Sequence, residues 1–281
     1  MRIAIVSQYF TPEPAKIPVG VAQGLASRGH SVRVVTGYPN YPTGRLYEGF
    51  RRRLVHYERH GRVLVRRVPM VISHSTNPFG RFASYVSFAL GSLMTRRFVQ
   101  NADVVYVYAT QMTAALAPQH WRRSMGIPYV LHVQDLWPES VTHSSLLPGF
   151  ARGLAAKSMS RWLRAAYQRA SAVIAIAPTM ARLLTERGAV PSKVETVLNW
   201  ADEAFAQPRR QDREQRAGLT VVYAGSLGDL QNLETAIDAA RLVADELPEF
   251  RLVIAGTGIA ESRLRRAASG LRNVEFRGWV P

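Results

Sequence analysis

Cysteine is absent from this chain of 281 residues, which excludes disulfide bonds and metal sites built from thiolates. Long hydrophobic runs are absent as well. The longest apolar-rich stretch without a charge, residues 82–95, has fourteen residues, fewer than the roughly 20 that a membrane-spanning helix needs. The opening segment MRIAIVSQYF has neither a long apolar core nor a cleavage site of small residues. It therefore predicts no export signal and a cytoplasmic location.

Lysine is scarce although the chain is strongly basic. Only Lys16, Lys157 and Lys193 are lysines among 36 basic residues, and the formal net charge is +16. Such arginine dominance reflects genome composition as readily as selection for phosphate recognition. If the charge serves binding, an anionic membrane face or a phosphorylated substrate is the expected partner. Nucleic acid is not expected, because the sequence has no zinc-finger spacing, no basic heptads and no RNP-like aromatic strand.

Short apolar strands alternate with amphipathic helical stretches along most of the chain, a pattern that is typical of βαβ units. The alternation runs from residue 2 to Asn199, and a predicted hairpin that turns near His60 and Gly61 interrupts it. Residues 207–218 have the composition of a linker, and after them the alternation begins again. We therefore predict an α/β fold with two Rossmann-like domains, residues 1–206 and residues 219–281.

The carboxyl ends of the predicted strands supply the first candidates for a site, because ligands of such sheets bind there. The stretch LHVQDLWPES, residues 131–140, places His132, Asp135 and Glu139 at or just after the end of an apolar run. Gly20 lies near the start of a predicted helix. It would let a phosphate or a sugar approach the backbone, or it is a packing glycine.

Two glycine loops follow strands of the second array. AGSLGD contains Gly225 and Gly228, and AGTGIA contains Gly256 and Gly258. Two glycines between a strand and a helix suit the binding of a diphosphate at the helix N-terminus. Neither loop completes the pattern G-x-G-x-x-G, which argues against a nicotinamide-dependent dehydrogenase.

Several stretches of the sequence together resemble family 4 of the retaining glycosyltransferases, which have the two-domain GT-B fold. The matching stretches are IAIVSQYFTPE, ASRGHSVRVVTGYPNYPTG, VQDLWPES, VIAIAPTMARLLTERG, KVETVLNWAD, YAGSLGDLQNLETAIDAA and LVIAGTG. GYPNYPTG and QDLWPES are the most specific, because a generic Rossmann sheet requires neither. The chain is most similar to enzymes that transfer N-acetylfucosamine-like sugars in bacterial surface polysaccharide assembly.

The resemblance implies a reaction in which a nucleotide sugar gives its glycosyl group to an acceptor hydroxyl with retained anomeric configuration. The first domain would bind the acceptor, a saccharide or a polyprenyl-diphosphate-linked sugar, and the second would bind the nucleotide sugar. No metal or cofactor is implied, because helix termini and cationic side chains stabilise the leaving diphosphate. Two other functions stay open: a non-catalytic acceptor-binding or scaffold protein, and a nucleotide-sugar epimerase on the same fold.

The family's motifs imply roles for individual residues. His132 matches the histidine that orients the donor sugar, and a core histidine is the alternative. Asp135 would bind an acceptor hydroxyl or hold His132 in place, so both belong to the expected catalytic centre. Gly20, Tyr41 and Glu139 would contact the acceptor, although Glu139 could instead cap a helix. The implied donor-binding residues are Gly225, Ser226, Gly228, Gln231, Gly256 and Gly258. Many relatives have arginine and lysine where this chain has Ser226 and Gln231.

The second array has only three predicted strands before Pro281, whereas a nucleotide-binding domain of this type has about five or six. The resemblance implies that further residues follow FRGWVP, including two glutamates spaced E-x₇-E. We therefore expect a C-terminally truncated chain with little or no transferase activity by itself.

Two basic helical stretches resemble helices that lie in a membrane interface. The first would place on one side Phe79, Phe82, Tyr85 or Val86, Leu90 and Leu93, with Arg81, Arg96 and Arg97 near its ends. The second, residues 151–170, has Trp162 among five cations. The alternative is that both helices simply cover the sheet of the first domain. We expect a protein peripheral to the inner face of the cytoplasmic membrane, with an anionic membrane surface as a partner.

Overall fold

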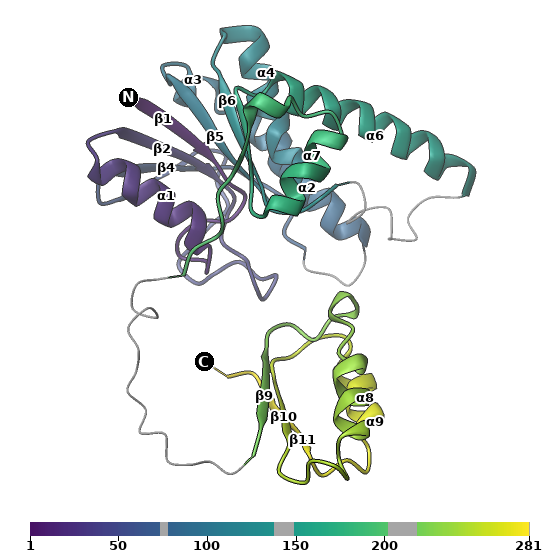
Figure 1. Cartoon of the computed structure of the whole chain (residues 1–281). Helices are drawn as coiled ribbons and strands as arrows, with labels where there is room; N and C mark the ends of the chain where they lie inside the picture. Colours follow the sequence, from purple (N-terminus) through teal and green to yellow (C-terminus); the bar gives the residue numbers. More distant parts are fainter. Residues whose placement is uncertain (74–77, 138–148, 202–217, 281) are drawn as a thin grey trace. The chain divides into compact units, whose positions relative to one another are not determined.

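The chain forms two compact units, Met1–Asp202 and Glu203–Pro281, in the computed structural model (Figure 1). The structure describes residues 1–73, 78–137, 149–201 and 218–280. Each unit contains a parallel or largely parallel sheet with helices packed on it, so the predicted α/β class is confirmed. Within the described ranges, no helix is both long enough and apolar enough to cross a membrane.

Eight strands form the sheet of the first unit, in the order β3-β4-β2-β1-β5-β6-β7-β8. Their bounds are β1 Arg2–Val6, β2 Ser31–Thr36, β3 His56–His60, β4 Val63–Arg67, β5 Val104–Ala109, β6 Tyr129–Val133, β7 Ala172–Ala175 and β8 Val194–Thr196. Neighbouring strands are parallel except β3 and β4, which form the predicted hairpin. The strand order reverses between β1 and β5, and such a switch point opens a crevice at the carboxyl ends of the strands.

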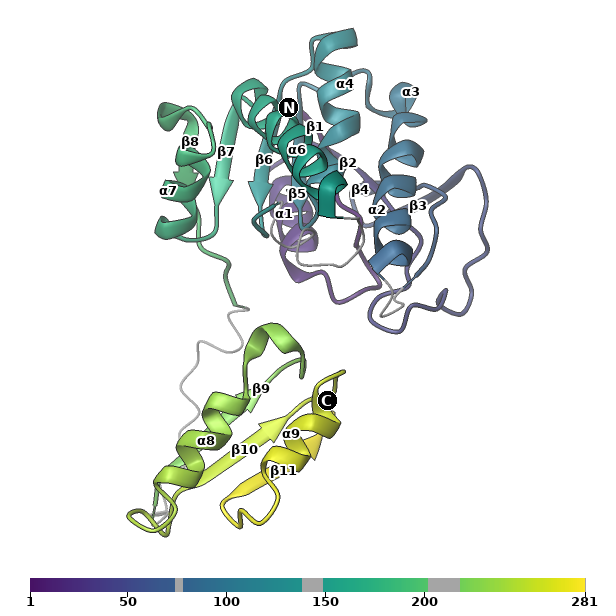
Figure 2. The same ribbon diagram turned by 90° about the vertical axis from the view of Figure 1, so that its right-hand side faces the viewer.

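Helices cover both faces of this sheet (Figures 1 and 2). Their bounds are α1 Lys16–Ser27, α2 Pro78–Leu93, α3 Arg96–Val99, α4 Leu116–Met125, α6 Gly149–Arg169 and α7 Pro178–Glu186. On one face, Ala22 and Ala26 of α1 pack with Ile5 and Val34 of the sheet. Helices α2, α4, α6 and α7 contribute to the larger core on the other face.

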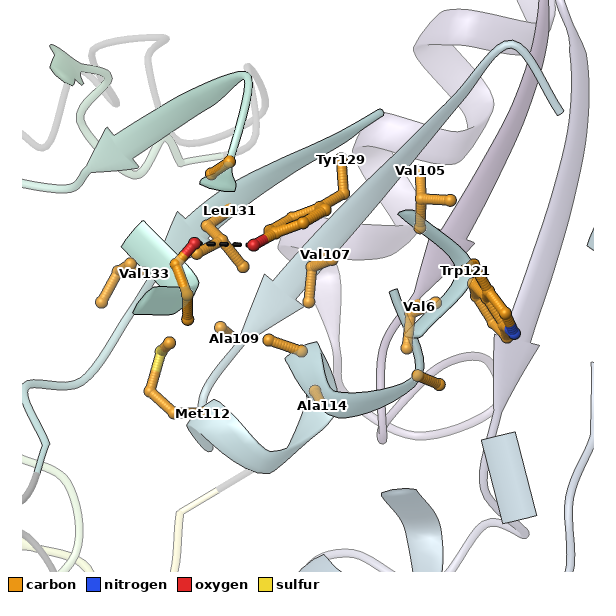
Figure 3. Packing of buried hydrophobic residues seen from close by; sticks show 14 of the residues in the cluster. Val6, Val105, Val107, Ala109, Met112, Ala114, Trp121, Tyr129, Leu131 and Val133 are labelled. Carbon is orange, nitrogen blue, oxygen red and sulfur yellow. Dashed lines mark hydrogen bonds between the residues drawn. The ribbon is translucent and has the colours of Figure 1, made fainter. Parts of the chain in front are cut away.

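The alternation of side chains along β5 and β6 decides which residues enter the larger core. Val107 and Leu131 point toward the helices and belong to the same cluster as Trp121 of α4 (Figure 3). The hydroxyl of Tyr129 donates a hydrogen bond of 2.7 Å to the carbonyl oxygen of Ala166 in α6. The intervening side chains of β5 and β6 therefore face the side of the sheet on which α1 lies.

Helix α2 divides its apolar residues between the core and the surface. Phe82 and Leu90 are 41% and 58% exposed, but Tyr85 and Leu93 pack against the core. Phe88, which the predicted stripe leaves out, is fully buried. This corrects the prediction of a single interfacial face, because α2 also has to cover the sheet with the same helical repeat.

Helix α6 serves mainly as a cover for the sheet. Leu163 and Tyr167 are buried, and Trp162 packs against the core beside them. The alternative interpretation of this basic helix, with its arginines on the wet side, is therefore favoured. For α2, the side chains of Phe79 and Arg81 lie outside the described residues.

The chain that leaves β8 returns toward α1 (Figure 1). The amide of Asn199 donates a hydrogen bond of 2.9 Å to the side-chain oxygen of Gln134, directly after β6. The indole of Trp200 lies against Gly20 of α1, 3.5 Å from the place of a Cβ atom. These contacts fix the end of the first unit beside the carboxyl ends of its strands.

Three parallel strands form the sheet of the second unit, in the order β11-β10-β9. Their bounds are β9 Thr220–Ala224, β10 Arg251–Ala255 and β11 Val274–Gly278, and the helices are α8 Glu234–Leu242 and α9 Glu261–Ala267. Both helices lie on one face of the sheet (Figures 1 and 2), where Ile237 and Leu264 pack with Ile254. Val222 of β9 is 61% exposed.

Candidate functional site

Two buried glutamines lie at the switch point of the first unit. Gln8 follows β1, Gln111 follows β5, and each is 1% exposed. The side-chain amide of Gln111 donates a hydrogen bond to the side-chain oxygen of Gln8. Gln8 in turn donates to the hydroxyl of Ser84 in α2 at 3.1 Å. Neither glutamine was predicted from the sequence as a site residue, although each stands two residues after a strand.

His132 lies in β6, on the same side of the sheet as α1. Its ring makes edge contacts with the rings of Tyr106 and Tyr108 in β5, at centroid distances of 5.8 and 5.9 Å. Nδ1 of His132 forms a hydrogen bond with the hydroxyl of Tyr106. The imidazole is 2% exposed, and burial lowers its pKa from 6.5 to about 4. His132 is therefore neutral at pH 7.

The second ring nitrogen of His132 is buried without a hydrogen-bond partner among the described residues, and so is the side-chain nitrogen of Gln134. An unsatisfied buried polar atom costs about 1–3 kcal/mol, so such atoms need a compensating role. The two lie two residues apart at the carboxyl end of β6. A ligand hydroxyl is the kind of group that would pair with either atom.

Asp135 is exposed just beyond β6, yet its pKa is raised because the surrounding protein displaces part of its water. Burial raises the pKa of Tyr108 to about 12, and the charge of Asp135 adds to the shift. The hydrogen-bond partner of His132 is Tyr106. This corrects the alternative in which Asp135 holds His132 in place. Glu139 lies outside the described residues.

Glu13 anchors the loop GYPNYPTG, a role that the sequence analysis did not predict. Its carboxylate accepts hydrogen bonds from the backbone N–H groups of Asn40 at 2.8 Å, Tyr41 at 2.9 Å and Phe10 at 3.2 Å. Burial raises the pKa of Glu13, and the three N–H groups oppose that rise. The sequence signal that could have indicated this role is the position of Glu13 between the two prolines of TPEP.

Tyr41 presents its ring at the surface of this anchored loop. The side chain is 42% exposed, and its centroid lies 5.4 Å from that of Tyr9. Arg67 of β4, fully buried, donates hydrogen bonds to the carbonyl oxygens of Gly37 and Thr11. The loops after β1 and β2 are therefore held together from both sides.

Gly20 lies within α1, where a Cβ atom would make an ordinary contact with the indole of Trp200. The indole of Trp200 therefore lies beside Gly20 at a distance that leaves room for a Cβ atom.

The two glycine loops of the second unit cross each other closely. A Cβ atom on Gly256, which has φ +143°, would lie 1.8 Å from the carbonyl oxygen of Gly225. A Cβ atom on Gly258 would lie 2.2 Å from the carbonyl oxygen of Leu227. Gly256 and Gly258 are therefore required by the backbone of the neighbouring loop, whatever else they contact.

Some backbone N–H groups of the predicted diphosphate-binding loops are hydrogen-bonded between the two loops. The backbone N–H of Gly225 donates to Ala255 at 2.9 Å, and that of Leu227 donates to Thr257 at 3.0 Å. These two amides are engaged in the loop crossing, so they are not free to donate to phosphates. The predicted donor residues nevertheless lie together at the carboxyl ends of β9 and β10.

A cation that was not predicted from the sequence lies at this loop, paired with two carboxylates. Ser226 and Gln231 carry none, and the side-chain oxygen of Gln231 lies 2.7 Å from the place of a Cβ atom on Gly228. Arg263 of α9 reaches the loop and pairs with Asp229 at 2.9 Å; it also pairs with Glu234. Among the described residues, no group of three or more His, Asp or Glu side chains could hold a metal ion.

This chain is similar in sequence and in fold to several known proteins. Residues 16–200 match the family model described as "Glycosyl transferase 4-like domain". The putative colanic acid biosynthesis glycosyl transferase WcaI of Escherichia coli (strain K12) is 27% identical over 297 aligned positions, covering 98% of this chain and 71% of that protein. The crystal structure of Anabaena HepE with UDP-glucose is 16% identical, with TM-score 0.60, covering 100% of this chain and 70% of that one. WaaG, a glycosyltransferase involved in lipopolysaccharide biosynthesis, is 15% identical, with TM-score 0.58 and coverage of 99% and 70%.

Proposed function

This chain belongs to the glycosyl transferase 4-like family, and on that premise we propose that it transfers a sugar, with retention, from a nucleotide sugar to an acceptor hydroxyl in cell-surface polysaccharide synthesis. The family match confirms the resemblance seen in the sequence. The similarity to HepE and WaaG confirms the GT-B type of fold. The observation that carries the proposal is the similarity to WcaI along 98% of the chain, since WcaI is named for colanic acid biosynthesis.

In the proposed reaction, the bond between the anomeric carbon and the donor diphosphate breaks while a bond to the acceptor oxygen forms on the same face of the sugar. The acceptor proton passes to the leaving phosphate oxygen, so the protein need not supply a base. This division of labour suits His132, because a buried imidazole with a pKa of about 4 is a weak base at pH 7. No resident metal or cofactor takes part.

His132 is proposed to orient the donor sugar through its second ring nitrogen, which has no partner among the described residues. Asp135 is proposed to bind an acceptor hydroxyl beside it. Tyr41 would stack on a sugar ring, and Gly20 and Glu139 complete the expected acceptor set. The donor diphosphate is assigned to the crossed glycine loops. The donor residues proposed are Gly225, Ser226, Gly228, Gln231, Gly256 and Gly258.

A polyprenyl-diphosphate-linked acceptor and a place on the inner face of the cytoplasmic membrane are part of the proposal. The exposed side chains of Phe82 and Leu90 on α2, with Arg96 and Arg97 exposed just after it, support that membrane contact. Such a combination of apolar and cationic groups is typical of interfacial helices.

The decisive experiment is a thermal-shift panel with nucleotides and nucleotide sugars, followed by a transfer assay with saccharide and lipid-linked acceptors. Donor binding should raise the midpoint of unfolding in proportion to affinity. Transfer to an acceptor supports the proposal. Binding without turnover would favour a scaffold, and isomerisation of the nucleotide sugar without an acceptor would favour an epimerase.

A further inference from the structure

A hollow of about 470 Å³ lies between α6 and α7 of the first unit, and the residues that line it are not those assigned to sugar transfer. Trp137, Leu163 and Tyr167 line its floor, and they are 2%, 3% and 0% exposed. Both helices lie on the side of the sheet opposite α1 (Figure 2). The floor is therefore made of packed aromatic and aliphatic side chains that exclude water.

Among the residues that the structure describes, the rim of this hollow, called here the α6–α7 pocket, carries four cations and one carboxylate. The cations are Lys157, Arg161, Arg164 and Arg187, and the carboxylate is Glu186. Glu186 is 60% exposed and pairs with Arg182 of its own helix at 3.8 Å. The cations are next to an apolar surface of low dielectric constant. Their positive potential is therefore stronger than the potential of the same charges in open solvent.

Three of these cations lie on one face of α6 because of their spacing along the helix. Lys157, Arg161 and Arg164 are separated by four and three residues, so they share one face of α6. Among the described residues, none of the three has a carboxylate partner. Like charges at this spacing destabilise a helix, and a bound anion would remove that repulsion.

Two further contacts hold the cations in place. A guanidinium nitrogen of Arg187 donates a hydrogen bond of 2.8 Å to the carbonyl oxygen of Trp137. The stem of Arg164 lies against Gly188, its Cγ 2.7 Å from the place of a Cβ atom. Any side chain on Gly188 would displace Arg164. The rim is thus partly preorganised, which lowers the entropy cost of binding.

We propose that the α6–α7 pocket binds a phosphate-bearing group, either a soluble phosphate ester or the phosphate of a membrane lipid. Planar guanidinium groups present paired N–H donors that match phosphate oxygens, and the hydroxyl of Ser160 on the same face adds a further donor. This binding is distinct from donor binding, since the proposed donor loops belong to the second unit.

The test compares a pocket variant, Lys157→Gln with Arg161→Gln and Arg164→Gln, with a control variant, Arg59→Gln with Arg62→Gln and Arg123→Gln. Both sets are exposed and remove the same charge. Titration calorimetry with inorganic diphosphate probes the soluble source. Flotation with vesicles of phosphatidylcholine and phosphatidylglycerol probes the lipid source. The single change Ser160→Asp, which removes no cation, provides a second pocket variant.

We expect the pocket variant and Ser160→Asp to weaken binding of at least one probe by about tenfold or more. The control variant should stay within about twofold of the wild type. Loss confined to diphosphate identifies a soluble phosphate ester, and loss confined to vesicles identifies a lipid. Equal loss in the pocket and control variants, or no binding of either probe to the wild type, overturns the proposal.

Discussion

The hydroxyl of Tyr106 and Nδ1 of His132 are hydrogen-bonded across β5 and β6, although the two residues are not paired in register. Tyr106 stands opposite Val130, and His132 stands opposite Tyr108. The bond is therefore a diagonal one, which a long aromatic side chain can span. It fixes the orientation of the imidazole, whose second nitrogen is buried without a partner among the described residues.

Replacing His132 by alanine should reduce sugar transfer far more than it weakens nucleotide binding, because His132 is assigned to the reacting centre. Turnover and nucleotide affinity are measured on the complete polypeptide. Tyr106→Phe, which removes only the hydroxyl, should lower kcat less than His132→Ala and leave nucleotide affinity unchanged. Unchanged turnover in His132→Ala would remove this residue from the site.

The free energy of unfolding should depend on pH through the titration of His132. Its pKa is about 4 in the folded chain and about 6.5 when unfolded, so the unfolded state binds more protons between these values. Its contribution is complete above pH 6.5 and decreases as the pH falls toward 4, by roughly 3 kcal/mol in all. Denaturant unfolding of the wild type and His132→Gln measures this.

The carboxyls of Glu13 and Asp135, whose pKa values are raised by desolvation, oppose this trend, because the folded chain then binds more protons than the unfolded chain. Both remain in the variant, so the difference between the two profiles isolates the histidine. A difference that does not change between pH 6.5 and 4 would contradict the assignment.

Glu13→Gln should loosen the loop that carries Tyr41. The amide keeps an oxygen for two N–H groups, but it places an NH₂ group opposite the third and loses the charge. We expect a loss of about 1–2 kcal/mol in unfolding free energy, faster hydrogen exchange at Asn40 and Tyr41, and a higher KM for acceptor. Glu48→Gln, on the exposed surface nearby, is the matched control. Unaltered exchange at both amides would argue against the anchoring role.

Replacing Arg81, Arg96 and Arg97 by glutamine should release the protein from anionic vesicles, and wild-type binding should fall as salt increases. Leu90→Ser tests the apolar part, since Leu90 is 58% exposed and its loss spares the core. Flotation at low and high salt is the measurement. Salt-insensitive binding, or none at all, would end the interfacial role of α2.

Gly256→Ala should unfold the second unit and spare the first. The new methyl group would collide with the carbonyl oxygen of Gly225, and φ of +143° is unfavourable for alanine, so a cost of roughly 3 kcal/mol or more is expected. Hydrogen exchange should show protection lost in residues 219–280 and kept in residues 2–73. Gly270→Ala, with φ +81° and no atom within 4 Å, separates backbone strain from collision. Equal effects of the two changes would show that the loop crossing is unimportant.

Much of the fold was predictable because period-two alternation and turn residues are local properties. The strands around Val107 and Leu131 follow from such patterns. The hydrogen-bond partner of His132 could not be predicted from such patterns, because Tyr106 is near His132 only through the register of two strands. The role of Glu13 was hidden for the same reason, as the N–H groups that donate to its carboxylate belong to two separate loops. For Gly256, the pattern suggested a phosphate, whereas the nearest constraint is the backbone of Gly225.

The bond between Gln8 and Gln111 also sets when the site can exist during synthesis. The two residues are separated by 103 positions, and β6 with His132 follows still later. When only β1, α1 and β2 have left the ribosome, Gln8 is present, but Gln111 and His132 have not yet been made. Closing so long a loop is slow and entropically costly. On the ribosome, the site should therefore appear as one of the last features of the first unit rather than as its nucleus.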